Sequence, residues 1–290
     1  FQHDEGGFKG HWSKSPVNRV VNQDIKVTWD LSRFHWAQVL SCAYSISGEP
    51  KYLDTLNDWF IDWNSSNPVN SGVNWACGQE CATRVIHVLN SIKILENVSI
   101  NSNSLVCFVL EHAKRIEPTI SYAISQDNNH ATSEAAALFI CGSWLLTQPT
   151  LSSKDKHLAI RWSKKGREIL EERVLRLVLE DGGFCMYSTN YHRVVLNTLS
   201  IVEFWKTKLL QENFSDNYIE KCRLATYWLY YLVDETTGDT LNLGANDGSN
   251  PFIFQNADYR DFRPSVQLAS VLFLQKKFYE NSPLINEPLE

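Results

Sequence analysis

The segment DNNHATSE, Asp127 to Glu134, places polar side chains directly before an apolar run. Asp and Asn are favoured N-cap residues, so Asn128 or Asn129 alone could cap a helix here. Capping does not require the histidine, however. His130 and Glu134 are four residues apart and would share one helical face, where the carboxylate could hold the imidazole in one tautomer. The segment therefore indicates either a satisfied structural cluster or a site where an imidazole works as an acid or a base.

A second polar cluster lies in EDGGFCMYSTNYHR, residues 180–193. Asp181-Gly182-Gly183 is a turn signal, and Tyr191 and His192 then open an apolar helical pattern. Phenol and imidazole groups can both transfer protons in a reaction. The same two residues also occur as ordinary rim residues of an amphipathic helix, and this alternative stays open.

The elements that must position these clusters follow from apolar residues that repeat with helical period along almost the whole chain. Turn residues such as Gly48 and Pro50 separate the repeats. The apolar stripes fall in residues 36–46, 52–63, 81–95, 106–120, 135–146, 158–177, 191–202, 219–232 and 266–273. Alternating strand patterns are scarce. The sequence therefore predicts an all-α protein with about nine or ten helices that pair as antiparallel hairpins.

Two of these predicted helices differ in how their apolar and charged residues are distributed, as helices of an inner and an outer layer do. Residues 135–146 are apolar nearly all round, as in a helix covered on every side, whereas residues 154–165 carry a charged stripe. This contrast predicts an (α/α) toroid of about five to six helical hairpins. Both polar clusters would then stand at the N-terminal ends of inner helices and converge at one rim of the central cavity. Because no linker rich in Pro, Gly or Ser divides the chain, residues 1–290 are predicted to form a single domain.

Composition excludes several classes of protein. The net charge of -6 and the scattered Lys and Arg residues argue against nucleic-acid binding. No uncharged apolar run is long enough to predict a membrane span. Seven cysteines, an odd number, sit mostly within apolar helical patterns and are expected to be free thiols. Cys77 and Cys81 are not followed by a second pair or by suitably spaced histidines, so we predict no metal site, and we predict no cofactor.

The two clusters together resemble the helical domain of the heparinase II/III and alginate lyase group of polysaccharide lyases. The likeness rests on NNHATSEAAAL followed about fifty residues later by DGGFCMYSTNYH. It extends, in the same order along the chain, to DIKVTWDLSRFHW (24–36), NPVNSGVNWACGQECATR (67–84) and LGANDGS (243–249). The resemblance therefore covers most of the chain.

This resemblance implies a bacterial lyase that cleaves a uronate-containing anionic polysaccharide, such as a glycosaminoglycan, by β-elimination. A base removes the C5 proton and the oxygen on C4 departs, while donors neutralise the substrate carboxylate. By their match to the family motif, Asn129 and His130 would be those donors, and His130 is also a candidate base. Tyr191 matches the catalytic tyrosine that protonates the leaving oxygen and on some substrates also serves as the base. A tyrosine must lose its proton to act as a base, and its ordinary pKa of ~10 disfavours this at neutral pH.

Further residues become candidates for contact with the sugar chain. Arginines suit a carboxylate or a sulfate, and tryptophan suits stacking on a sugar face. The candidates are Arg33, Trp75, Glu80, Arg84, Glu134, His192 and Asn246. For each of them a rim ion pair, a core aromatic or a turn remains the alternative. Met186 departs from the family pattern, which has a polar and often acidic residue there.

The resemblance also implies a longer protein. Family members continue into a C-terminal β-sandwich that closes over the cleft and contributes another catalytic histidine, and nothing after Phe273 resembles it. Residues 1–290 are therefore expected to be the N-terminal part of such a protein, and alone they could be inactive. The family is often periplasmic or secreted, whereas seven free cysteines favour a reducing compartment such as the cytoplasm.

Two other functions remain open. A glycoside hydrolase on a similar toroid would need two carboxylates facing each other, and Glu80 with Asp247 is the best available pair. A glycan-binding or polysaccharide-assembly protein could keep the toroid without catalysis.

Overall fold

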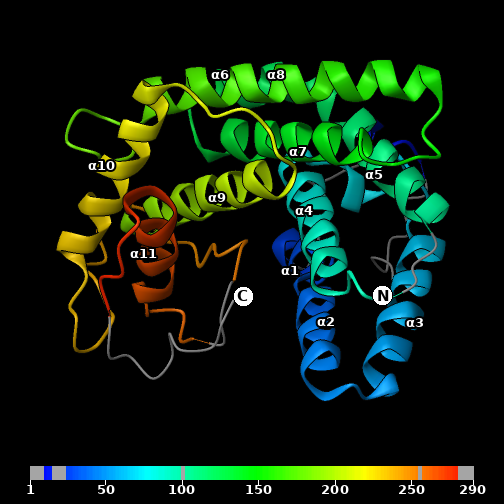
Figure 1. The fold of residues 1–290 in the computed structure, drawn as a ribbon, viewed down its shortest axis with the longest axis horizontal. Coiled ribbons are helices and arrows are strands. Elements are labelled where there is room, and N and C mark those ends of the chain that lie inside the picture. Colours follow the sequence, from blue (N-terminus) through cyan, green and yellow to red (C-terminus); the bar gives the residue numbers. More distant parts are fainter. Residues whose placement is uncertain (1–9, 15–23, 99–101, 254–256, 280–290) are drawn as a thin grey trace.

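The computed structural model describes residues 10–14, 24–98, 102–253 and 257–279. Within these ranges the chain forms helices and isolated β-bridges but no strand, which confirms the all-α class (Figure 1). The α-helices are α1 (Ile25–Leu31), α2 (His35–Ser47), α3 (Pro50–Ser66), α4 (Gly78–Ile94), α5 (Ser102–Ile116), α6 (Ile120–Ser125), α7 (Asn129–Leu145), α8 (Ser153–Leu177), α9 (Thr189–Lys208), α10 (Asp216–Leu232) and α11 (Arg263–Ala269). Short 3-10 turns are η1 (Trp12–Lys14), η3 (Val73–Trp75) and η4 (Glu117–Thr119), and η5 (Ser270–Leu274) is a π-helical turn.

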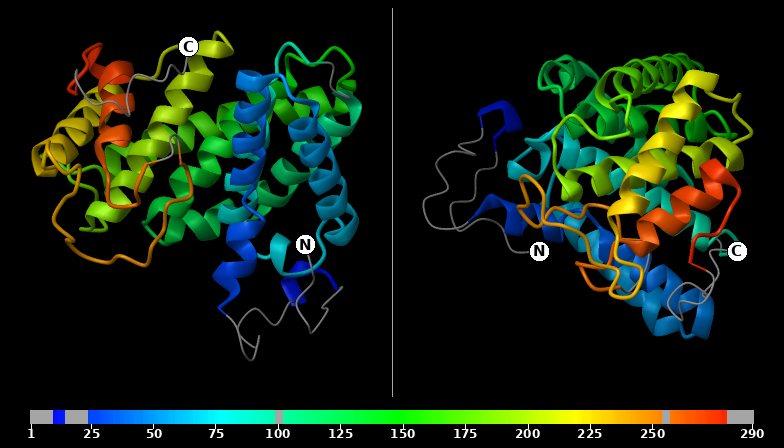
Figure 2. Two further views of the ribbon diagram at one scale, coloured as in Figure 1. Left: turned by 90° about the horizontal axis from the view of Figure 1, so that it is seen from below. Right: turned by 90° about the vertical axis from the view of Figure 1, so that its left-hand side faces the viewer.

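The helices form an inner row and an outer row. Helices α2, α4, α7, α9 and α11 pack against one another in chain order, and α3, α5, α8 and α10 each pack behind the inner helix that precedes them (Figures 1 and 2). This is the arrangement of an (α/α) toroid. In the described part of the chain four hairpins are complete rather than five to six, because α11 is followed only by the short turn η5.

Helix α7 is the centre of the structure. Apart from His130, every residue of this helix is buried, as its apolar sequence predicts. Helix α8 crosses it at very short range. A Cβ atom on Gly142 would overlap the backbone of α8, and one on Gly166 would overlap the backbone of α7. The hydroxyls of Ser143 and Ser163 are 2.8 Å apart at the same crossing. Two glycines therefore set the distance between the inner and the outer layer.

Side-chain caps fix where the two important inner helices begin. The Asn128 carboxamide oxygen accepts a hydrogen bond from the backbone N–H of His130 at 2.9 Å and caps α7. The Ser188 hydroxyl accepts one from the backbone N–H of Tyr191 at 3.1 Å and caps α9. Pro264 lies in the first turn of α11, where proline is favoured because no helical hydrogen bond needs its missing N–H. The capping role thus falls to Asn128, and the side chain of Asn129 is left for other contacts.

The cysteines are not paired with one another. All seven cysteines are free thiols. Burial raises the pKa of Cys77 to about 12, so this thiol is not a thiolate nucleophile at neutral pH. In the described ranges no group of three His, Cys, Asp or Glu side chains is arranged to hold a metal ion. Among the same residues, no helix combines the length and the apolar character that crossing a membrane requires.

Candidate functional site

Tyr191 lies in the first turn of α9 and donates its hydroxyl hydrogen to Asp247. The distance from the Tyr191 oxygen to Asp247 Oδ2 is 3.0 Å, and the same carboxylate oxygen accepts a hydrogen bond from Lys26 Nζ at 2.9 Å. Lys26 belongs to α1, so three segments that are far apart in the sequence meet at one carboxylate. Tyr191 is therefore a held side chain, not a freely rotating rim residue.

The surroundings of Tyr191 favour its protonated form. Burial, and then the neighbouring Asp247 carboxylate, raise the pKa of the phenol to about 12, while the positive charge of Arg33 acts in the opposite direction. A second tyrosine, Tyr259, also raises it. At neutral pH the phenol consequently keeps its proton, which suits a proton donor better than a base.

Arg33 and Glu80 form a bidentate ion pair beside Tyr191. Arg33 Nε lies 2.7 Å from Glu80 Oε2, and Arg33 Nη2 lies 2.8 Å from Glu80 Oε1. Asp30 accepts a further hydrogen bond from the same guanidinium. Arg33 precedes α2 and Glu80 lies in the first turn of α4, so the pair joins two inner helices. Two carboxylates thus offset the charge of Arg33, which acts on Tyr191.

Asn129 and His130 are the first two residues of α7. No described residue forms a side-chain hydrogen bond with the amide of Asn129 or the imidazole of His130, although both residues are largely enclosed. Burial lowers the pKa of His130, and the charge of Glu80 opposes this shift. The imidazole is therefore neutral at neutral pH and can accept a proton.

Glu134 does not hold His130. Its carboxyl group turns toward α4, where a Cβ atom on Gly78 would stand only 2.6 Å from it, and its Oε2 atom has no hydrogen-bond partner among the described residues. Burial raises the pKa of Glu134 to about 8, and the charge of Arg115 acts in the opposite direction. The tautomer-fixing contact expected from the spacing of four residues is not formed, and Glu80 is the carboxylate whose charge acts on His130.

Two predicted groove residues belong to the core instead. Trp75 is 2% exposed, and its Nε1 donates to the Asn67 carbonyl at 3.2 Å. Arg84 is fully buried and donates to the carbonyls of Ser32 and Asn74, each at 2.7 Å. Neither side chain is available to a sugar. Both residues are therefore core residues, which was the alternative to a role in sugar binding.

His192 is also a core residue. It is fully buried, its Nε2 lies 2.8 Å from the Ala225 carbonyl, and its ring stacks on Trp228 at a centroid distance of 4.4 Å. Neighbouring residues on an α-helix point about 100° apart. Since Tyr191 faces the rim, His192 has to face the layer behind, and the two side chains do not share a groove.

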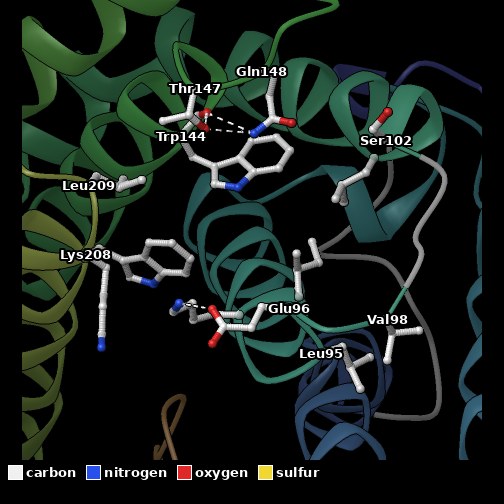
Figure 3. Close-up of a pocket in the computed structure, with 13 residues that line it drawn as sticks. Leu95, Glu96, Val98, Ser102, Trp144, Thr147, Gln148, Lys208 and Leu209 are labelled. Carbon is white, nitrogen blue, oxygen red and sulfur yellow. Dashed lines mark hydrogen bonds and ion pairs between the residues drawn. The ribbon is translucent and has the colours of Figure 1, made fainter.

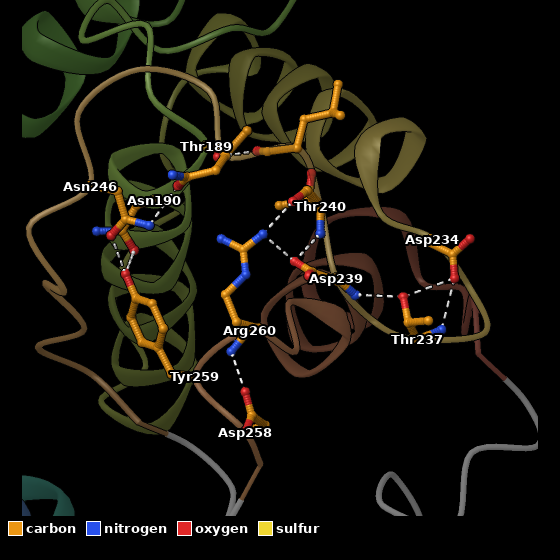
Figure 4. Close-up of polar contacts among 12 residues, drawn as sticks. Thr189, Asn190, Asp234, Thr237, Asp239, Thr240, Asn246, Asp258, Tyr259 and Arg260 are labelled. Atoms are coloured by element: carbon orange, nitrogen blue, oxygen red, sulfur yellow. Dashed lines mark hydrogen bonds and ion pairs between the residues drawn. The ribbon is translucent and has the colours of Figure 1, made fainter.

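Asn246 shapes the loop that carries Asp247. Its carboxamide oxygen accepts a hydrogen bond from the Tyr259 hydroxyl at 2.5 Å, and its amide donates to Asn242 at 2.7 Å (Figure 4). The Tyr259 hydroxyl also lies 3.0 Å from the side-chain oxygen of Asn190, in the first turn of α9. The loop is thereby tied to the helix that carries Tyr191.

Backbone contacts add to this attachment. Thr189 Oγ1 donates to the Leu241 carbonyl at 2.8 Å, and Ser188 Oγ donates to the Ala245 carbonyl at 2.5 Å. Gly244 has a positive φ of 69°, and a Cβ atom there would overlap the Tyr187 carbonyl. Arg260 holds the start of the loop through the Thr240 carbonyl at 2.6 Å (Figure 4). The position of Asp247 is therefore fixed by the fold.

A cavity of about 480 Å³ lies at the other end of the inner helices (Figure 3). It is lined by the last turns of α4, α7 and α9, including Lys93, Trp144 and Lys208, and by the start of α5. Helices of this length measure roughly 25–30 Å, which separates the cavity from the first turns that carry the polar residues. Lys93 is already paired with Glu96 there. The cavity therefore plays no part in the candidate site.

Two residues of the site were not among the sequence candidates. Lys26 lies in the quoted segment DIKVTWDLSRFHW, and nothing local marks it as functional. Asp247 was considered only as one carboxylate of a hydrolase pair with Glu80. The signal that could have found Asp247 is its place directly after Asn246 in LGANDGS, a motif that the family resemblance already singled out.

Comparison with known proteins bears directly on this arrangement. A curated heparin-sulfate lyase of Bacteroides thetaiotaomicron is 23% identical over 231 residues, which cover 73% of this chain and 32% of that protein. A second heparin-sulfate lyase, from Bacteroides stercoris, is 24% identical over 207 residues, or 64% of this chain and 29% of the relative. The chain thus spans about a third of the length of these curated relatives.

Solved structures share the fold. A crystal structure of heparinase III matches with a TM-score of 0.59 and 18% identity, over 90% of this chain and 38% of that chain. The heparan sulfate lyase HepC from Pedobacter heparinus matches with a TM-score of 0.55 and 19% identity, over 79% of this chain and 34% of that chain. The family model for the heparinase II/III N-terminus matches residues 3–250. The chain therefore belongs to the heparinase II/III family and contains the family's N-terminal helical domain.

Proposed function

We propose that this chain is the helical part of a polysaccharide lyase that cleaves a uronate-containing glycosaminoglycan by β-elimination. The observation that carries the proposal is the Arg33–Glu80 ion pair, because Glu80 acts on His130 and Arg33 acts on Tyr191. This pair links the first turns of the neighbouring helices α7 and α9, which carry a neutral imidazole, a protonated phenol and a carboxamide with no side-chain partner among the described residues. The heparin-sulfate lyase relatives support a glycosaminoglycan as the substrate.

Each residue has a role in the proposed reaction. Asn129 donates hydrogen bonds to the substrate carboxylate and stabilises the negative charge that spreads onto it when the C5 proton leaves. His130, neutral at rest, accepts the C5 proton. Tyr191 gives its proton to the oxygen that departs from C4. The C5–H and C4–O bonds break, a C4–C5 double bond forms, and the proton balance is met by imidazolium and phenolate.

We also propose that the same protein has a β-sandwich domain that covers the cleft. Support comes from the lengths of the relatives, of which this chain matches about a third. Such a domain would supply further groups to the substrate and would exclude water from the reacting atoms. We propose a bacterial periplasmic or secreted location for such a protein.

A glycoside hydrolase fits the same residues less well. A general acid needs a carboxyl group with a raised pKa. The pKa of Asp247 is lowered, because the hydrogen bonds from Lys26 and Tyr191 outweigh its burial. Glu80 is held by both nitrogens of the Arg33 fork. Both carboxylates of the candidate pair are thus committed to cations.

The test is to incubate the complete gene product with heparan sulfate, heparin, chondroitin sulfate, hyaluronan and alginate, and to follow the ultraviolet absorbance of the unsaturated product. We expect absorbance to rise with at least one glycosaminoglycan. New reducing ends without unsaturation would indicate a hydrolase, and binding without either product would indicate a glycan-binding protein.

Tyr191→Phe is the matched variant in this assay, because it removes only the hydroxyl. We expect turnover to fall by at least about 100-fold, the lower end of what one proton-transfer group contributes, while the dissociation constant for the glycan stays within a few-fold. An active Tyr191→Phe protein would remove the phenol from the mechanism.

A further inference from the structure

The described contacts place a carboxylate, not a cation, directly on the hydroxyl of the candidate proton donor. Asp247 Oδ2 accepts from Tyr191 at 3.0 Å and from Lys26 at 2.9 Å. A tyrosine that served as the resting base would have to lose its proton beside this carboxylate. Two negative charges would then share one hydrogen-bond distance, which disfavours the phenolate.

We propose that Asp247 is a positioning residue that keeps Tyr191 protonated and fixes it as the acid of the elimination, with Lys26 holding the carboxylate in place. This inference rests on the proposed function and gives a role at the Tyr191 site to a residue that the sequence suggested only as one carboxylate of a hydrolase pair. It also assigns the base role to His130, because the phenol is held in its acid form.

The charged groups around Tyr191 come from every element packed against it. Asp247 lies on the loop after α10, Lys26 on α1, and Arg33 at the start of α2. Tyr259, on the segment before α11, also acts on the phenol. Arg33 is bound to Glu80 and Asp30, so its charge is the more strongly offset of the two cations. Among the charged neighbours, the carboxylate of Asp247 therefore has the largest effect on the phenol, and it acts in the same direction as burial.

The loop geometry gives Asp247 little freedom to leave. Its Oδ1 accepts a hydrogen bond from the backbone N–H of Ser249 at 3.1 Å, which leaves Oδ2 directed at Tyr191 and Lys26. The preceding residue, Asn246, is fixed by Tyr259. Both oxygens of the Asp247 carboxylate are thus hydrogen-bonded. The contact between Asp247 and Tyr191 is therefore part of the folded site.

The test measures the acidity of the phenol itself. The complete protein carries 3,5-difluorotyrosine at position 191, whose phenol ionises at lower pH than that of tyrosine, and its ¹⁹F NMR signal is followed as the pH is raised. Asp247→Asn keeps an acceptor oxygen but removes the charge. We expect the pKa of this phenol to fall by about one unit or more in Asp247→Asn, the usual effect of one close charge.

Two further variants separate charge from loop geometry. Asp247→Glu keeps the charge and should leave the phenol closer to its wild-type pKa than Asp247→Asn does. Asp58→Asn, which changes an exposed carboxylate on α3, should leave the pKa unchanged. Equal pKa values in the wild type and in Asp247→Asn, or equal shifts in the Asn and Glu variants, would overturn the proposal.

An activity arm links the contact to turnover. In the protein with ordinary tyrosine, the alkaline limb of kcat/KM should move to lower pH in Asp247→Asn and return in Asp247→Glu. An unmoved limb in an active Asp247→Asn enzyme would contradict the assignment of Tyr191 as the acid. The absence of any unsaturated product in the wild type would contradict the proposed function instead, and the ¹⁹F titration would still decide whether Asp247 controls the phenol.

Discussion

At the scale of single residues, ionisation states at the rim are set mainly by burial and by one or two neighbouring charges. Tyr191 has a raised pKa and His130 a lowered one, so at neutral pH both are uncharged. One can give a proton and the other can take one, which a concerted elimination requires. Pairs of titratable groups whose pKa values move apart in this way commonly mark acid and base roles.

Glu134 offers a test of burial that does not depend on catalysis. Its pKa is raised to about 8 in the folded protein and is near ~4.3 in an unfolded chain. Between these values the folded protein binds more protons than the unfolded chain. The free energy of unfolding contributed by this residue therefore falls as the pH rises through that window.

Glu134→Gln removes this ionisation, so the variant should gain stability relative to the wild type as the pH rises. We expect the difference in free energy of unfolding, variant minus wild type, to increase by roughly 1 to 4 kcal/mol between about pH 5 and pH 8. Urea denaturation at several pH values measures it. The exposed Glu168→Gln serves as the control and should show a flat difference. Parallel pH curves for Glu134→Gln and the wild type would show that Glu134 ionises normally.

At the scale of elements, the sequence predicts helix positions well and side-chain partners poorly. The apolar stripe over 135–146 correctly indicates a fully covered helix, since α7 is buried on all sides. The contact between Lys26 and Asp247 joins residues 221 positions apart and leaves no local pattern. The direction of His192 could be derived from helical geometry once Tyr191 is assigned to the rim. The burial of Trp75 depends on how η3 packs against α5, which periodicity does not reveal.

The crossing of α7 and α8 gives a prediction about packing. A methyl group at Gly166 would overlap the backbone of α7, and backbone atoms cannot rotate away as a side chain can. Gly166→Ala should therefore lower the free energy of unfolding by about 3 kcal/mol, even though alanine favours the helix. Chemical denaturation measures the loss. Lys164→Ala, on the exposed face of the same helix, should stay within about 0.5 kcal/mol of the wild type.

A stabilised or neutral Gly166→Ala protein would mean that the two helices can separate without cost, so the glycine would not set the distance between the layers.

At the scale of the whole molecule, the inner row of helices forms an arc with its own continuous core. We expect residues 1–290 to unfold in a single cooperative transition when produced alone. We propose that a covering domain supplies further groups to the reaction. Turnover by the isolated segment should therefore be at least about 100-fold below that of the complete gene product, comparable to the loss of one or more catalytic groups.

Differential scanning calorimetry and the unsaturated-product assay check these two expectations on the same sample. Full activity of residues 1–290 would show that the helical domain holds the entire site. Two separate transitions would show that the arc is divided into independently folding parts.

The common direction of the inner helices has an electrostatic consequence. The last turns of α4, α7 and α9 line one cavity, so their first turns lie at the opposite end of the inner row, the end that carries Tyr191. Each such end acts as roughly half a positive elementary charge through the aligned peptide dipoles. This field comes from the backbone, so no change of pH within the stable range of the protein removes it, and no mutation of a lysine or arginine does. A chain with a net charge of -6 can in this way present a locally positive rim to a polyanion, while Arg33 and Lys26 remain bound to their own carboxylates.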